Sequence, residues 1–80
     1  MIEVHYFAGL RELAGIANSS LPWQAGLTVG QIRFLLSKQC PAIAGLLARS
    51  RIAVNDTLAD DADTVPDRAE VALLPPVSGG

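Results

Sequence analysis

The sequence predicts an α+β domain in which one main helix crosses one face of a mixed sheet. Strand-like segments near both ends of the chain, residues 2–7 and 70–74, lead to this prediction. Between them, a segment that begins at Thr28 has apolar residues at the spacing of an amphipathic helix. Since a chain of 80 residues has room for only one domain, these elements must share a single small core.

The elements before the main helix are short. In residues 2–7 the side chains alternate in polarity, as they do in a half-buried strand. Residues 9–15 begin and end with glycine and have room for a turn or two of helix. Residues 19–23 predict a second strand. Because Pro22 cannot donate a ladder hydrogen bond, we expect this strand at an edge of the sheet.

The main helix has a clear start and a clear end. Thr28 and Gln31 match a capping box, in which the side chain of each residue bonds the backbone amide of the other. The residues predicted to face the core are Val29, Ile32, Leu35 and Leu36. We expect Arg33 on the opposite, solvent-facing side. Pro41 cannot continue this helix but can begin another. The residues expected to turn inward from that second helix are Ile43, Leu46 and Leu47.

The second half of the chain returns to strands. Residues 51–54 predict a third strand, and the Asn55-Asp56 pair after them is a turn signal. Residues 60–63 are acidic and predict a solvated loop, which lacks the central glycine and terminal glutamate of a calcium loop. Residues 70–74 predict the final strand.

Composition and charge exclude several classes of protein. Six basic and eight acidic residues give a formal charge of −2 without any basic run, which argues against a nucleic-acid partner. No segment approaches the roughly 20 apolar residues that span a bilayer, and the N-terminus lacks the features of a signal peptide. The only cysteine, Cys40, can form neither an internal disulfide nor a metal-ligand set. We therefore expect a cytoplasmic protein that binds no metal and lies on no membrane.

The last six residues, Pro75-Pro76-Val77-Ser78-Gly79-Gly80, are the most informative part of the sequence. Two prolines favour an extended, stiff exit from the domain. Terminal glycines contribute no packing, but without Cβ atoms they can enter a narrow channel. We expect residues 1–74 to form the domain and residues 75–80 to form a flexible tail that enters the active site of a partner.

The chemistry of such a tail would belong to the carboxylate of Gly80. A carboxylate is inert until it is activated, and adenylation by ATP would make Gly80 an acyl donor. Attack by sulfur would then leave a thiocarboxylate, and attack by an amine would leave an amide. These residues indicate a carrier whose own end reacts, although a frayed terminus without chemistry remains open.

The sequence resembles the small subunits of molybdopterin synthase, a family of sulfur carriers with the ubiquitin-like β-grasp fold. Residues 4–8 and 11–13 resemble the opening strand and first turn of that family, and residues 53–55 resemble its middle strand. Residues 70–80, Glu-Val-Ala-Leu-Leu-Pro-Pro-Val-Ser-Gly-Gly, carry the most specific likeness. The family has Gly-Asp before this ending, where the chain has Arg68-Ala69, so we expect a different turn there.

The resemblance implies a cycle in which Gly80 carries sulfur. A ubiquitin-activating-type enzyme would use ATP to adenylate Gly80, and a sulfur donor protein would convert it to the thiocarboxylate. The tail would then enter the large subunit of molybdopterin synthase and give sulfur to the cyclic pyranopterin precursor. In this family two large and two small subunits form a heterotetramer. The small subunit binds no cofactor, and general acid and base groups belong to the large subunit.

Three alternatives stay open at this point. Another Gly-Gly carrier could serve thiamine thiazole synthesis, although the Pro75-Pro76-Val77-Ser78 run argues against it. A ubiquitin-related modifier could attach Gly80 to lysines of other proteins. The chain could also be an interaction domain whose tail has no chemistry.

Other side chains are better explained by structure than by chemistry. Cys40, at the end of the main helix, is expected to pack as a small hydrophobe. His5 has no motif that marks it as a catalytic base, and Trp23 is expected to pack at the sheet margin.

Phe7 and Leu74 suggest a partner surface. In the first strand Ile2, Val4 and Tyr6 form the more apolar set, which leaves Phe7 on the opposite face. If the first and last strands pair in parallel, Phe7 and Leu74 share that face. We expect them to form a partner interface, with Arg11 at its rim.

Overall fold

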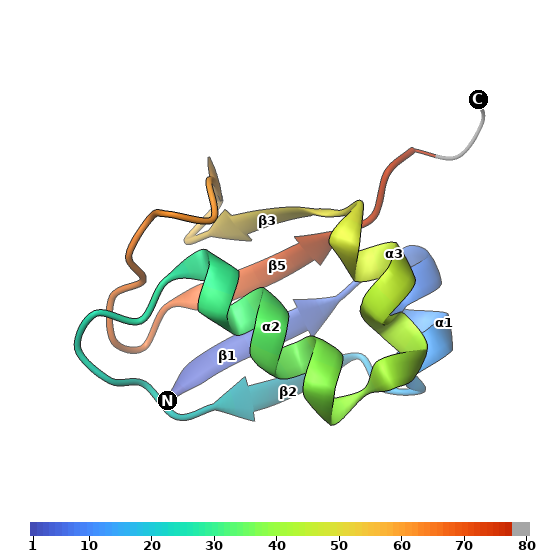
Figure 1. Cartoon of the computed structure of the whole chain (residues 1–80), viewed down its shortest axis with the longest axis horizontal. Coiled ribbons are helices and arrows are strands. Elements are labelled where there is room, and N and C mark those ends of the chain that lie inside the picture. Colours follow the sequence, from blue (N-terminus) through green and yellow to red (C-terminus); the bar gives the residue numbers. More distant parts are fainter. Residues whose placement is uncertain (78–80) are drawn as a thin grey trace.

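A computed structural model describes residues 1–77 and contains a five-stranded sheet in the order β2-β1-β5-β3-β4 (Figure 1). The strands are β1 (Ile2–Tyr6), β2 (Asn18–Leu21), β3 (Arg51–Val54), β4 (Thr57–Ala59) and β5 (Glu70–Leu74). β1 and β5 are parallel, whereas the other neighbouring strands are antiparallel. The predicted mixed sheet is therefore confirmed, and so is the edge position of the second strand.

The helices cover one face of this sheet, and α2 runs across it (Figure 1). The helical elements are α1 (Ala8–Ala14), α2 (Val29–Gln39), the 3-10 turn η1 (Pro41–Ile43) and α3 (Ala44–Ala48). The prediction of one main helix with shorter ones around it is confirmed. Within residues 1–77, no helix has the length and apolar character that crossing a membrane requires.

The core lies between α2 and the sheet. The alternation in β1 turns Ile2, Val4 and Tyr6 toward the helices, and all three are buried. β5 does the same with Val71 and Leu73. The helices contribute Leu10, Val29, Ile32, Leu36, Ile43 and Leu47. Because one side of the sheet is covered, the other side of β1 and β5 is left for solvent or a partner.

The start of α2 is fixed by two sets of hydrogen bonds. The predicted capping box is present, since Thr28 Oγ1 accepts from the Gln31 amide at 3.2 Å and Gln31 Oε1 accepts from the Thr28 amide at 3.0 Å. The next two amides, of Val29 and Gly30, donate to carbonyls of the acidic loop, at Asp63 and Asp61. The side chains of this loop are exposed, but its backbone carbonyls cap the helix.

Four details differ from the sequence predictions. Leu35 was expected in the core but is 37% exposed, because the covered face of α2 is narrower than its apolar stripe. Arg33 was expected in solvent but is half-buried, with hydrogen bonds to carbonyls of the following segment. β2 ends at Leu21, so Trp23 lies outside the strand and donates a hydrogen bond to the Val65 carbonyl. The three-residue strand β4 was not predicted at all.

The turn between β3 and β4 is tight. Asn55 and Asp56 both have left-handed backbone conformations, with φ of 48° and 69°. Such a pair matches the twist of two antiparallel strands, and asparagine and aspartate tolerate it better than other residues with side chains. The turn therefore places both side chains at a fixed position beside the start of β5.

Candidate functional site

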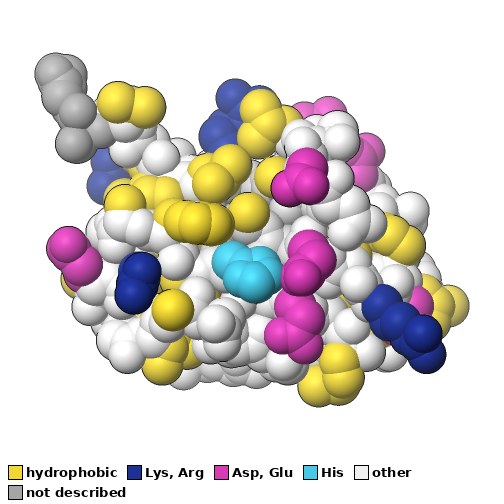
Figure 2. Space-filling view, turned by 180° about the vertical axis from the view of Figure 1, so that it is seen from behind, with side chains coloured by type: hydrophobic (Ala, Val, Ile, Leu, Met, Phe, Trp, Pro, Cys, Tyr) yellow, Lys and Arg dark blue, Asp and Glu magenta, His cyan; other side chains and the backbone are white. Residues whose placement is uncertain are grey.

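The candidate functional site is the side of the sheet that no helix covers. We call it the sheet face and define it by the side chains of β1, of β5 and of Phe7, the residue after β1, that point away from α2: Glu3, His5, Phe7, Glu70, Ala72 and Leu74. The register pairs Glu3 with Glu70 and His5 with Ala72, which confirms that the two strands run in parallel. Figure 2 views the molecule from this side and shows hydrophobic side chains above and to the upper left of the histidine and acidic ones to its right.

Phe7 and Leu74 lie at the same end of the sheet face. Tyr6 pairs with Leu73, and both side chains point into the core. The residue after each of them, Phe7 or Leu74, therefore points to the uncovered side. Phe7 is 47% exposed, a large fraction for an aromatic side chain, and Leu74 is half-buried. Contiguous exposed apolar surface of this kind is typical of places where another protein docks. Their role as an interface stays a prediction.

Arg11 lies one helical turn beyond Phe7. Phe7 is the N-cap residue of α1, and its carbonyl accepts hydrogen bonds from the amides of Leu10 and Arg11 at 3.1 and 3.3 Å. The side chain of Arg11 is exposed and lines a shallow hollow with Ala8, Glu12, Gly15, Ile16 and Ala17. The backbones of Phe7 and Arg11 are thus one helical turn apart, and the place of Arg11 at the rim of an interface stays a prediction.

The tail leaves from the Leu74 end of the sheet face (Figure 1). β5 leads directly into Pro75, which is half-buried, while Pro76 is exposed and Val77 is 97% exposed. The division into a domain and a flexible tail stays a prediction. The predicted site residues Ser78, Gly79 and Gly80 lie outside the described residues.

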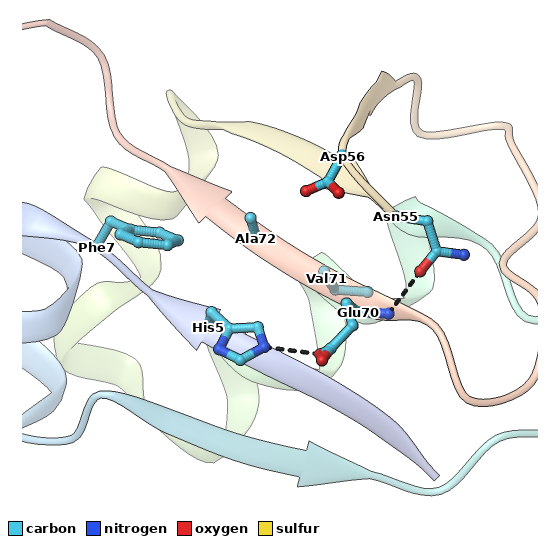
Figure 3. A pocket seen from close by; sticks show the side chains of 7 residues that line it. All are labelled: His5, Phe7, Asn55, Asp56, Glu70, Val71 and Ala72. Carbon is cyan, nitrogen blue, oxygen red and sulfur yellow. Dashed lines mark hydrogen bonds and ion pairs between the residues drawn. The ribbon is translucent and has the colours of Figure 1, made fainter.

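A hollow of about 450 Å³ opens on the sheet face beside Phe7. Its lining consists of His5, Phe7, Asn55, Asp56, Glu70, Val71 and Ala72 (Figure 3). His5 Nε2 and Glu70 Oε2 are 2.8 Å apart, and both side chains are partly exposed. The Asn55 side-chain oxygen accepts from the Glu70 amide at 2.9 Å, and the Asn55 amide donates to the Glu70 carbonyl at 2.8 Å.

Sequence reasoning missed this hollow because its members come from three segments. The sequence shows no motif around His5, and nothing in it links this histidine to Glu70 or to the Asn55-Asp56 turn. The signal that could have found the pair is the parallel register of β1 and β5. That register brings residues of the two strands on the uncovered face into adjacent rows.

Cys40 and Trp23 both have contacts that indicate a structural role. Cys40 is partly buried and packs against the core, which confirms the prediction of a packing role. Trp23 is held at the sheet margin by its hydrogen bond of 2.7 Å to Val65. Among residues 1–77 no group of three or more histidine, cysteine, aspartate or glutamate side chains could hold a metal ion.

Known proteins resemble this chain over nearly its whole length. Residues 4–80 match the ThiS family. The chain is 32% identical over 79 residues to the molybdopterin synthase sulfur carrier subunit of Arabidopsis thaliana, a match that covers 99% of this chain and 82% of that protein. Here sequence likeness extends through the tail as well as the domain.

Two solved structures show the same fold. SAMP1, a small archaeal modifier protein from Haloferax volcanii, superposes with a TM-score of 0.86 at 28% identity, over 99% of this chain and 98% of that chain. A chain in the complex of subunits 1 and 2 of the molybdopterin-converting factor from Helicobacter pylori gives a TM-score of 0.70 at 28% identity, covering 99% and 97%.

These likenesses confirm the ubiquitin-like β-grasp fold and the resemblance on which it was predicted. The family match includes β1, β5 and the residues that follow them, so it covers both the sheet face and the tail. The chain belongs to the ThiS family.

Proposed function

We propose that this chain is the sulfur carrier subunit of a molybdopterin synthase and that the carboxylate of Gly80 carries the sulfur. The observation that carries the proposal is the likeness to a molybdopterin synthase sulfur carrier subunit over 99% of the chain. The geometry of the described residues supports it, because a partner on the sheet face would lie beside the start of the tail.

Four chemical steps make up the proposed cycle. An activating enzyme of the ubiquitin-activating type joins the Gly80 carboxylate to AMP from ATP, and pyrophosphate leaves. A persulfide of a donor protein displaces AMP and forms an acyl disulfide. A thiol then cleaves this disulfide, which leaves the thiocarboxylate on Gly80 and a disulfide on the donor. The tail then enters the large subunit and transfers sulfur to the cyclic pyranopterin precursor. In this proposal the chain contributes positioning and the reacting carboxylate, while the large subunit contributes acid and base groups.

The sheet face is the proposed contact for the large subunit. Phe7 is its aromatic anchor, Leu74 extends its apolar surface and Arg11 lies at its rim. Aromatic residues and arginine are enriched at protein interfaces, and a few such residues carry most of the binding energy. A chain in a complex of subunits 1 and 2 of a molybdopterin-converting factor has the same fold. We propose that this chain forms the corresponding complex, as a heterotetramer of two large and two small subunits in the cytoplasm.

Intact mass spectrometry tests the proposed function. After incubation with ATP, the activating enzyme and a sulfur source, part of the protein should carry one sulfur in place of one oxygen. Deletion of Gly80, or one added residue after it, should abolish both this form and the synthesis of molybdopterin. Synthesis that persists with an extended, untrimmed tail would show that the Gly80 carboxylate is not the carrier.

A protein modifier is the second candidate, because a small archaeal modifier protein has the same fold at 28% identity. The two functions differ in the nucleophile that attacks activated Gly80: sulfur in a carrier and a lysine amine in a modifier. Covalent adducts with other proteins that require Gly80 and survive thiol reductant would support the modifier. A deletion strain separates the proposed carrier from a thiamine carrier, since it should lose molybdoenzyme activity and still grow without thiamine.

A further inference from the structure

The hollow on the sheet face combines carboxylates with an apolar floor. Glu70 and Asp56 contribute negative charge, while Phe7 and Ala72 contribute apolar surface; the Val71 side chain points into the core. Among the described residues that line it, His5 is the only one able to carry a positive charge. Figure 3 shows Ala72 between the Phe7 ring and the turn that carries Asp56. A cationic group on an apolar stem would complement both parts.

The carboxylate of Glu70 is already positioned. The backbone of Glu70 makes hydrogen bonds with Asn55 in both directions, and its carboxylate bonds His5 Nε2 at 2.8 Å. The neighbouring Asp56 belongs to the tight β3–β4 turn, whose backbone is fixed by two consecutive left-handed residues. A group that is held before binding loses less conformational entropy when a partner arrives, so such carboxylates suit an interface.

Charge is distributed unevenly along the sheet face. Glu70 lies at the start of β5, with Glu3 beside it in the register. At the other end of β5, Leu74 pairs with Arg51, which is exposed and does not line the hollow. Arg11 lies near that end as well, one turn from Phe7. The face is therefore acidic far from the tail and basic near it.

We propose that the hollow receives an arginine side chain of the protein that docks on the sheet face, an inference that rests on the function proposed above. The planar guanidinium can bond the carboxylates of Glu70 and Asp56 with separate N–H groups while its plane stacks against Phe7. A lysine ammonium is a compact point charge and would use only part of this arrangement.

The arginine would fix the orientation of the complex. An apolar contact around Phe7 and Leu74 is non-directional and by itself permits several rotations of the carrier on its partner. Complementary charges select among such orientations more than they add affinity. A charge pair at the start of β5 and an apolar contact at its end hold this strand in one direction on the partner. Since the tail follows β5, the two contacts together direct the tail toward the partner's active site.

Binding to the molybdopterin synthase large subunit tests this inference. Glu70→Gln and Asp56→Asn each remove one charge and keep the side-chain shape, and titration calorimetry at low and moderate salt measures their effect. We expect Glu70→Gln to weaken the complex about tenfold, equivalent to about 1.4 kcal/mol. The Kd of the variant should also depend less on salt, because the charge pair that salt screens is absent from its complex. Asp56→Asn should change affinity and salt dependence in the same direction.

Glu3→Gln is the matched control. Glu3 lies on the same face and accepts a hydrogen bond from Ser20 at 3.0 Å, but it does not line the hollow. Its substitution changes the net charge equally and should leave the Kd within about twofold, a difference below 0.5 kcal/mol. A loss as large as that of Glu70→Gln would mean that general charge on the face, not the hollow, attracts the partner. Circular dichroism and thermal melting verify that each variant is folded.

Arginines of the large subunit are then replaced by lysine, one at a time. One replacement should weaken binding to the unmodified carrier and have no further effect with Glu70→Gln, as a double-mutant cycle requires. If Phe7→Ala weakens the complex but Glu70→Gln and Asp56→Asn do not, the proposed function stands and this inference is wrong. If the unmodified carrier does not bind the large subunit, both are wrong. If Glu70→Gln instead alters self-association in sedimentation velocity, the occupant is a second copy and the inference is also wrong.

Discussion

Arg33 connects three segments through one side chain. Its guanidinium donates to the carbonyls of Leu47 and Ser50, the latter at 2.9 Å, and to the carboxylate of Asp61 at 3.0 Å. These carbonyls lie at and just after the end of α3, where a helix runs out of amides of its own. The Leu47 carbonyl also accepts from the Ser50 amide at 3.1 Å. The arginine therefore caps one helix from the surface of another and also holds the acidic loop.

Arg33→Ala should lower the free energy of unfolding by about 1–3 kcal/mol, the range for leaving polar groups without their partner. Urea denaturation followed by circular dichroism measures it. Arg49→Ala is the control, because the Arg49 side chain is exposed and makes no hydrogen bond or ion pair among the described residues. Its effect should stay within about 0.5 kcal/mol, as is usual at exposed positions. Equal midpoints for the two variants would contradict the capping role.

Cys40→Ser should leave sulfur transfer nearly intact, because this thiol packs against the core and the proposed cycle places the sulfur on Gly80. A hydroxyl in place of the thiol is less suited to that environment, so we expect a cost of about 0.5–3 kcal/mol. Thermal melting gives the cost, and the intact-mass assay with activating enzyme gives the transfer. A well-folded variant that no longer forms the thiocarboxylate would make Cys40 part of the chemistry after all.

At the scale of the element, α2 shows what sequence can determine. Its capping box was predicted from two side chains three residues apart, and the structure confirms both hydrogen bonds. β1, β5 and the turn after β3 were predicted for the same reason. Alternating polarity, proline and asparagine each favour a particular backbone conformation in the residues next to them. Signals of this kind depend on local geometry alone.

Features that depend on distant segments could not be predicted in the same way. The three residues of β4 are too few for a periodic signal, and the strand exists because β3 offers it an edge. Leu35 has the spacing of a core residue, but the sheet below α2 covers only part of the apolar stripe. The contact between His5 and Glu70 requires the register of two strands 65 residues apart. Tertiary packing decides each of these cases.

Thr28→Ala should destabilise the domain by about 1 kcal/mol, the usual effect of removing an N-cap side chain. The loss is limited because the Val29 and Gly30 amides keep their partners in the acidic loop. Thr28→Ser retains the hydroxyl and should restore most of the stability. Urea denaturation distinguishes the two variants. If serine is as harmful as alanine, the methyl group of Thr28 matters and the cap does not.

At the scale of the whole molecule, the fold places the core and the proposed recognition surface on opposite sides of the sheet. All the helices pack on one side of the sheet, so the other side can present apolar surface without exposing the core. The tail starts at the end of the same sheet, on the strand that carries Leu74. A partner that binds the sheet face therefore lies where it can receive the tail, and no movement of the domain is required.

Among the described residues the sheet face is exposed apolar surface beside the start of the tail, yet the proposed cycle needs two partners. Activation and sulfur transfer both require the tail in an active site, so both partners should dock beside it. If each uses Phe7, their complexes exclude one another and the cycle proceeds by exchange. Phe7→Ala should therefore weaken both complexes by at least about 1 kcal/mol, the usual threshold for a residue that matters at an interface.

Competition measures this directly: large subunit added to a labelled complex of carrier and activating enzyme should displace it, with a midpoint given by the two Kd values. Phe7 is 47% exposed, so the variant should remain folded, and circular dichroism and thermal melting verify it. Unfolding of Phe7→Ala would mean that the side chain supports the core, and Leu74→Ala would then test the face in its place. A stable ternary complex, or a folded variant that binds both partners normally, would contradict a shared face and require a second docking surface.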